Sequence, residues 1–229
     1  MNNAAYLALL RDATDRVLPG AGELAEIDVE FRRPIPPDVD LDVDVAIRRS
    51  GDGGCVVGYE IFLDGASRAT AVATWRTAVE TAAPLPALDR DAGGRTFAWA
   101  HTVRSYELSP DGALRPSAAL QWFEYAVYRA AERVGWTAER MRDADFVTLQ
   151  IGHHLTIGPH PRVGERLEIV SRIVELRRVS GMWHHEARSG EAVTAADRSR
   201  GAFLDVAGKP RRAPGDMIAA LLRGDAGMA

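Results

Sequence analysis

A helical stretch in the second half of the chain carries a carboxylate on the flank of its apolar face. Apolar residues recur there at the spacing of one helix face, namely Leu120, Phe123, Val127, Ala130 and Val134. Glu124 lies beside that face. A partly buried carboxylate is costly unless it is paired or used, so Glu124 is the leading candidate for a catalytic base. The alternatives are an ion pair with an arginine of the other half of the chain and a solvated side chain beside Tyr128.

Asp111 is the second candidate carboxylate. It lies in the segment SPDGALRPS, in the loop directly before the helical stretch. Pro-Asp-Gly is also an ordinary turn sequence, so the residue types alone leave a catalytic and a purely local role open.

Two pairs of adjacent histidines, His153-His154 and His184-His185, lie in stretches predicted to be strands. Neighbouring side chains on a strand point to opposite faces, so only one ring of each pair can reach a site on a given face. We predict that His154 points inward and name it as the third candidate catalytic residue. One ring of each pair plus a carboxylate is a conceivable zinc site, but the i, i+4 spacing of helical zinc motifs is absent. We assign no metal and expect no cofactor.

The elements that must position these residues occur twice. In the first half, Ile27, Val29 and Phe31 alternate with polar neighbours, and further strands are predicted near residues 41–47, 56–63 and 69–77. In the second half, a helix over residues 117–136 precedes strands predicted near 146–157, 166–176, 182–188 and 192–205. The segment AAYLALLRDA overlies SAALQWFEYA, which sets Arg11 at the position of Glu124. This repeat predicts two copies of a helix with an antiparallel sheet.

The predicted boundaries follow from this repeat. We assign residues 1–85 to a first unit, 86–95 to a linker rich in proline, glycine and alanine, and 96–229 to a second unit.

Composition narrows the range of partners. The net charge of −4 gives no general electrostatic reason to bind nucleic acid or an anionic membrane. A single cysteine, Cys55, excludes an internal disulfide and fits a reducing compartment. The sequence shows no membrane span and no signal peptide, so we expect a cytoplasmic protein.

At this level the sequence resembles the hotdog-fold superfamily, in particular the double-hotdog acyl-ACP thioesterases and the 4-hydroxybenzoyl-CoA thioesterase type. VRSYELSPDGALRPSAALQWFEYA looks like the first hotdog of an acyl-ACP thioesterase. MNNAAYLALLRDA with ELAEIDVEFRRPIPPD looks like the second hotdog, whose signature is His-Val-Asn-Asn-x-x-Tyr. The halves stand in the opposite order from that family, and the first half begins at the Asn-Asn position, without a leading strand and catalytic loop.

The resemblance implies an α+β fold of two tandem hotdogs, each a curved antiparallel sheet around a central helix. They form a pseudo-dimer within one chain, and a further homo-oligomer is left open. The implied partner is an acyl-CoA or an acyl carrier protein, whose thioester carbonyl sits near a helix start, where free N–H groups can polarise it. The substrate-binding residues expected on this basis are Asn2, Asn3, Tyr6, Arg115 and Ser117.

The implied activity is hydrolysis of that thioester by carboxylate-assisted attack of water. The 4-hydroxybenzoyl-CoA type can carry a helical Glu at the position of Glu124, and another lineage places an Asp near Asp111. Because Arg11 cannot act as a base, we expect at most one working site per chain, in the cleft built on the second helix. The alternatives are a hotdog hydratase or dehydratase and a non-catalytic acyl-binding or partner-binding protein.

Overall fold

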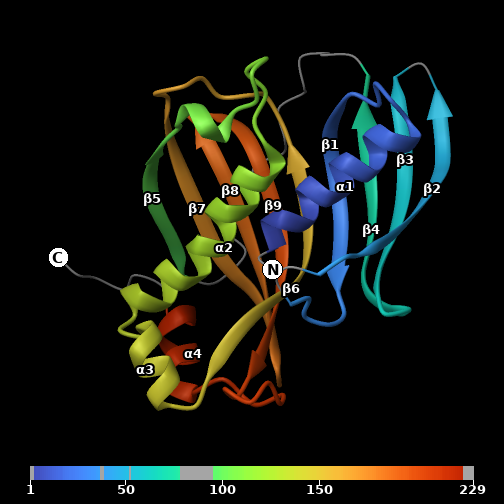
Figure 1. Ribbon diagram of the computed structural model, residues 1–229. Coiled ribbons are helices and arrows are strands. Elements are labelled where there is room, and N and C mark those ends of the chain that lie inside the picture. Colours follow the sequence, from blue (N-terminus) through green and yellow to red (C-terminus); the bar gives the residue numbers. More distant parts are fainter. Residues whose placement is uncertain (1–2, 37–38, 52, 78–94, 224–229) are drawn as a thin grey trace.

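One continuous antiparallel sheet organises the chain. The structure, a computed structural model, describes residues 3–36, 39–51, 53–77 and 95–223. Within these ranges, nine strands form the sheet in the order β2-β3-β4-β1-β6-β9-β8-β7-β5. Helices α1 and α2 lie on the same face of this sheet (Figure 1).

The first unit consists of a helix followed by a four-stranded meander. Helix α1 (Asn3–Val17) precedes β1 (Glu23–Phe31), β2 (Asp42–Gly51), β3 (Gly54–Leu63) and β4 (Ala66–Arg76). Burial alternates along β1 and β4, as predicted for strands with one face against a helix.

The second unit repeats this order and adds elements at both ends. Strand β5 (Thr96–Thr102) and a short 3₁₀ turn, η1 (Ser105–Glu107), precede α2 (Pro116–Arg133) and α3 (Ala138–Asp143). The meander then runs through β6 (Val147–Ile157), β7 (Arg166–Arg177), β8 (Ser180–Ser189) and β9 (Ala192–Leu204). Helix α4 (Gly215–Leu222) follows. Alternation did not predict β5, which pairs with β7 at the edge of the sheet.

The two units are joined by antiparallel pairing of β1 with β6. Asp28 lies opposite His154 at the middle of this pair, with Ile27 opposite Leu155 beside it. On both sides of this junction, the strands follow one another in the equivalent order, β1-β4-β3-β2 on one side and β6-β9-β8-β7 on the other. The sheets of the two units are thereby joined into one.

The strand irregularities show how closely the units repeat. Register shifts occur at residue 24 in β1, residue 47 in β2 and residue 61 in β3. The second unit has shifts at the equivalent places, at 150, 173 and 187, a constant offset of 126 residues. Because bulges bend a strand locally, both units have their curvature at equivalent positions.

The core crosses the junction between the units. One cluster of buried side chains includes Leu7 and Leu10 of α1, Leu120 and Phe123 of α2, and Leu155 of β6. A second cluster lies under the end of α2, α3 and α4, and includes Phe146 and Trp183. The central helix of each unit therefore packs partly on the other unit.

Most of the predicted arrangement is confirmed, and part of it lies outside the described residues. The helix and the four strands predicted for each half are present. In the described part of the first unit, β2 is the outermost strand, which is compatible with the expected lack of a leading strand. Most of the predicted 86–95 linker lies outside the described residues, so the unit boundaries stay a prediction. No helix among the described residues is long and apolar enough to cross a membrane.

The junction yields a stability prediction. Leu155 is fully buried on β6, whereas Leu149 on the same strand is 44% exposed. Leu155→Ala is expected to lower the free energy of unfolding by about 2–5 kcal/mol, because the cavity opens at the shared core. Leu149→Ala is the matched control, with an expected change within about 0.5 kcal/mol.

Urea unfolding followed by far-ultraviolet circular dichroism and by tryptophan fluorescence measures both variants. Coincident transitions are expected, since one core spans both units. Two separate transitions, one per unit, would contradict this account of the junction.

Candidate functional site

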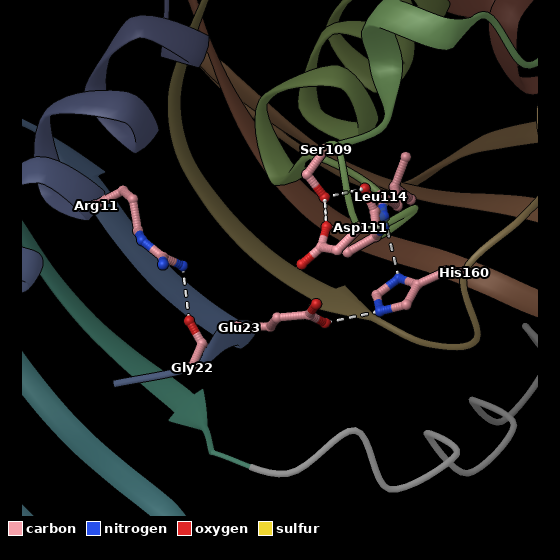
Figure 2. A network of polar contacts seen from close by, with 8 residues as sticks. Arg11, Gly22, Glu23, Ser109, Asp111, Leu114 and His160 are labelled. Atoms are coloured by element: carbon pink, nitrogen blue, oxygen red, sulfur yellow. Dashed lines mark hydrogen bonds and ion pairs between the residues drawn. The ribbon is translucent and has the colours of Figure 1, made fainter. Parts of the chain in front are cut away.

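A cleft of about 720 Å³ lies between the two units. Its walls are the second half of α1, the start of β1, the end of β4, the loop before α2 and the first residues of α2. Figure 2 shows the polar side chains that the two units place around it. The cleft is therefore a candidate for a site that needs both halves of the chain.

A histidine and a glutamate join the two units at this cleft. Nδ1 of His160, which follows β6, accepts the N–H of Leu114 over 3.2 Å. The opposite nitrogen, Nε2, must then carry the proton, and it donates to Oε2 of Glu23 over 2.8 Å. The imidazole is neutral in this arrangement and fixes one carboxylate oxygen of Glu23 (Figure 2).

Asp111 faces Glu23 from the other unit (Figure 2). Its carboxylate accepts the Ser109 hydroxyl and, over 3.4 Å, the N–H of Ala113. The Ser109 bond is the main reason why the pKa of Asp111 is lowered, with the Ala113 N–H adding to it. Asp111 is thus an ionised carboxylate at the entrance to α2, and a weak base.

The start of α2 presents a free donor to the cleft. Pro116 occupies the first helical position and has no N–H, while Ala118 and Ala119 both donate to the carbonyl of Arg115. In the described part of the chain, the N–H of Ser117 has no acceptor, and Ser117 lines the cleft. This N–H lies at the positive end of an 18-residue helix.

A buried glutamate holds this helix start in place. Glu107 accepts the Trp122 indole N–H over 2.8 Å and the Arg104 N–H over 2.7 Å, and it contacts His101 at 3.0 Å. Burial alone would raise the pKa of Glu107, but these hydrogen bonds outweigh burial and lower it. The carbonyl of Glu107 accepts the N–H of Arg115, which ties the helix start to this network.

Arg11 of α1 forms the opposite wall. Its guanidinium donates to the carbonyl of Gly22 over 2.6 Å (Figure 2). It also donates to Asp15 over 2.8 Å. Gly22 has φ +90°, and a Cβ there would lie 1.7 Å from the carbonyl oxygen of Arg76. Only glycine therefore fits at this turn, which brings the start of β1 against the end of β4.

Glu124, the leading candidate for the base, does not line this cleft, and its role as a base stays a prediction. Arg11, its counterpart on α1, lies there instead. The physical reason is the helix packing: α1 lies beside α2, and the second half of α1 faces the start of α2.

Glu124 belongs to a buried charged cluster under α2. Its Oε1 lies 3.8 Å from Nε2 of His153, whose Nδ1 bonds to Asp197 over 2.8 Å. The side chain of Glu124 is 19% exposed and that of His153 is 1% exposed. Burial alone would lower the pKa of His153, but Asp197, with a smaller contribution from Glu124, raises it.

The predicted inward orientation of His154 is wrong. His154 has a 42% exposed side chain and lies 3.0 Å from Glu26 on the outer face of the sheet. His153 is the inward member of the pair, because the register shift between Gln150 and Gly152 changes the alternation along β6. The structure therefore places His154 in neither the cleft nor the buried cluster.

The second histidine pair splits in the same way. His185 is buried between Ser171 and Ser199, and burial lowers its pKa to about 4. His184 lies on the opposite face of the strand, and burial lowers its pKa as well. Within the described ranges, no three His, Cys, Asp or Glu side chains are grouped so that they could hold a metal ion.

The remaining predicted residues divide between the cleft and other places. Arg115 and Ser117 both line the cleft, and Nε of Arg115 donates to the carbonyl of Leu108 over 2.9 Å. Tyr6 is buried and packs its ring against Phe31. Asn2 lies outside the described residues, and Asn3 is the first residue of α1, with no description of its side chain.

Sequence reasoning missed Glu23 and His160. Both lie at strand ends, and neither belongs to a motif that points to chemistry. The repeat contained one indication of His160. The segment PIPPDVDLDV of the first half aligns with HPRVGERLEI of the second half, so that His160 corresponds to Pro34. The two aligned loops therefore differ at this position, where only the loop of the second half has a titratable residue.

Comparisons with known proteins agree with this architecture. Residues 1–77 match the family model of the acyl-ACP thioesterase C-terminal domain. The acyl-CoA thioesterase II TesB2 of Mycobacterium marinum has a TM-score of 0.61 at 14% identity, over 90% of this chain and 89% of that chain. The TesB protein of Mycobacterium avium subspecies paratuberculosis gives 0.61 at 12% identity, over 89% and 87%.

A smaller relative matches about half of the chain. The 1,4-dihydroxy-2-naphthoyl-CoA thioesterase of Synechocystis has a TM-score of 0.51 at 14% identity, over 55% of this chain and 95% of that chain. A comparison with curated proteins finds no match. The double-hotdog fold is thereby confirmed, as is the resemblance to the hotdog thioesterases.

The buried cluster yields a pH prediction. The pKa of His153 is raised in the folded chain above the ordinary 6.5, so its protonated form stabilises the fold below that pH. This contribution is lost as the pH rises through the raised pKa. Asp197, Glu124 and His185 are among the groups that face the ring, and Asp197 is the main charge that raises the pKa of His153.

Nuclear magnetic resonance of the imidazole protons measures this pKa directly. We expect a midpoint above 6.5 in the natural chain and a lower midpoint in Asp197→Asn, where burial is no longer outweighed. Titration of His153 below 6.5 in the natural chain would show that burial, and not Asp197, dominates.

Proposed function

We propose that the chain hydrolyses an acyl thioester, of CoA or of an acyl carrier protein, in the cleft between the two units. The observation that carries the proposal is the meeting of three features in one cleft. These are the free N–H of Ser117 at the start of α2, the carboxylate of Glu23 from one unit and the carboxylate of Asp111 from the other. The match to the acyl-ACP thioesterase domain and the likeness to an acyl-CoA thioesterase support this class of reaction.

The helix start supplies the site for the thioester carbonyl. Backbone N–H groups at a helix N-terminus stabilise the negative charge that develops on a carbonyl oxygen during attack. The Ser117 N–H is such a donor, and its orientation is fixed by Pro116 and by the Glu107 network behind it. We therefore place the carbonyl oxygen at Ser117.

Glu23 is the proposed general base. Its Oε2 is held by His160, which leaves Oε1 to accept a proton from water. Water then adds to the thioester carbon, and the tetrahedral intermediate collapses by breaking the carbon–sulfur bond. The proton passes from Glu23 to the departing thiolate, so the products are a carboxylic acid and a free thiol.

Asp111 and Arg115 have supporting roles in this proposal. Because hydrogen bonds lower the pKa of Asp111, its ionised carboxylate orients the water and is not the base. Arg115 is exposed at the rim of the cleft, with Nε held by Leu108, and its remaining N–H groups are available to the polar arm of the substrate.

Substitution of the carboxylates tests the assignment. Glu23→Gln keeps the shape and the bond from His160 but removes the base, so turnover is expected to fall about 100-fold or more. Asp111→Asn is expected to have a smaller effect. Release of free thiol from a panel of acyl-CoA and acyl-carrier-protein thioesters measures both, and circular dichroism verifies that each variant is folded.

Glu124→Gln is the decisive comparison, because the role of Glu124 as a base stays a prediction. Glu124 lies in the buried cluster with His153, outside the cleft, so this variant is expected to keep most of its turnover. A larger loss in Glu124→Gln than in Glu23→Gln would move the reaction to the flank of α2. Binding without release of thiol in the natural chain would instead indicate an acyl-binding protein.

A further inference from the structure

The largest buried side chain that lines the cleft is that of Trp75. Trp75 lies near the end of β4, is 3% exposed and lines the cleft beneath α1. Leu10, Cys55 and Tyr59, each at most 5% exposed, belong to the same core cluster, and Cys55 lies opposite Trp75 on the neighbouring strand β3. An acyl chain that enters from the helix start therefore meets an indole ring backed by packed side chains.

A directed chain of hydrogen bonds fixes this ring. The indole Nε1–H of Trp75 can only donate, and it donates to the Tyr59 hydroxyl over 2.7 Å. The Thr14 hydroxyl donates to the carbonyl of Leu10 over 2.7 Å, so its oxygen accepts the Tyr59 proton over 2.6 Å. Every proton in the series from Trp75 to Leu10 has one direction, and rotation of the ring would leave the buried indole N–H without its acceptor.

The cleft side of the ring is fixed as well. The guanidinium of Arg11 lies 5.3 Å from the centre of the Trp75 ring. Arg11 donates in turn to the Gly22 carbonyl and to Asp15, which orient the guanidinium beside the ring. The indole is therefore confined by a cation on one side and by a hydrogen bond at its edge.

We propose that Trp75 is a specificity-determining residue that limits the substrate to a short acyl group. The inference rests on the proposed thioester site, since the acyl group extends from a carbonyl at Ser117 toward this wall. A confined ring yields poorly to extra methylenes, and one methylene more or less in an apolar pocket is worth about 10–200-fold in discrimination. The proposal therefore predicts that acetyl and butyryl groups are accepted in front of the ring and that octanoyl and longer groups are excluded.

The test uses S-alkyl-CoA thioethers, which have no carbonyl to hydrolyse and so measure the wall without the chemistry. Titration calorimetry gives the ratio of the affinities for S-octyl-CoA and S-ethyl-CoA. The natural chain is expected to favour S-ethyl-CoA. Trp75→Leu removes the wall and keeps an apolar core side chain, so the octyl-to-ethyl ratio is expected to rise at least about tenfold.

Two further variants keep the test independent of stability. Trp75→Phe removes less volume and is expected to raise the ratio by less, which provides a reading if Trp75→Leu does not fold. Trp183→Leu is the matched control, since Trp183 is also 3% exposed but lies in the second core cluster, away from the cleft. Its octyl-to-ethyl ratio is expected to equal that of the natural chain.

The outcomes separate this inference from the proposed function. A shift of the ratio in the Trp75 variants alone supports the inference even if no thioester is hydrolysed, in which case the proposed function fails. A natural chain that binds S-octyl-CoA as tightly as S-ethyl-CoA overturns the inference, even if it hydrolyses both acyl thioesters. An unchanged ratio in folded Trp75 variants, or no binding of either thioether, also overturns it.

Discussion

The pairing of β1 with β6 is the interaction on which the rest of the structure depends. It joins the four-stranded sheet of the first unit to the five-stranded sheet of the second unit, which gives one nine-stranded sheet. Helices α1 and α2 then share a core on one face of that sheet. Glu23 comes just before the paired part of β1, and His160 comes just after the paired part of β6. Because the two strands are antiparallel, these two positions lie at the same end of the pair, and both side chains reach the same cleft. A unit without its partner would leave that cleft with one wall and half of its polar groups.

The helix start is held by a layer of groups that never reach the cleft. Glu107 collects three hydrogen-bond donors at a buried position, and its own carbonyl receives the N–H of Arg115. These bonds settle where α2 begins, and with it the direction of the Ser117 N–H. On the other wall, the hydroxyls of Tyr59 and Thr14 hold Trp75 in the same indirect way. Precise placement in this cleft thus comes from buried polar pairs behind the surface.

The sequence predicted the helices and strands better than it predicted the contacts between them. Strand alternation and the helical stripe over Leu120, Phe123 and Val127 located the helix and four strands in each half, because these patterns are local. The inward histidine was misassigned, since the bulge near Gly152 shifts the alternation by one residue. The contact of Glu124 with His153 was not predicted, and Glu23 and His160 were missed, because helix packing and strand pairing over more than a hundred residues decide these contacts. Arg115 and Ser117 line the cleft because they stand at a helix start, which can be read from Pro116, and their role in substrate binding stays a prediction.

The covalent link between the units removes a restriction that governs symmetric dimers. In a dimer of identical hotdogs, every substitution occurs twice, so a residue that suits one cleft is forced upon the other. Here the equivalent helix positions hold Arg11, which is in the cleft at the start of α2, and Glu124, which is in the buried cluster with His153. The tandem chain can therefore accept a mutation on one side while its counterpart stays unchanged. Each half can therefore accumulate its own substitutions and acquire its own role, while the shared sheet keeps the two halves in the same relative position.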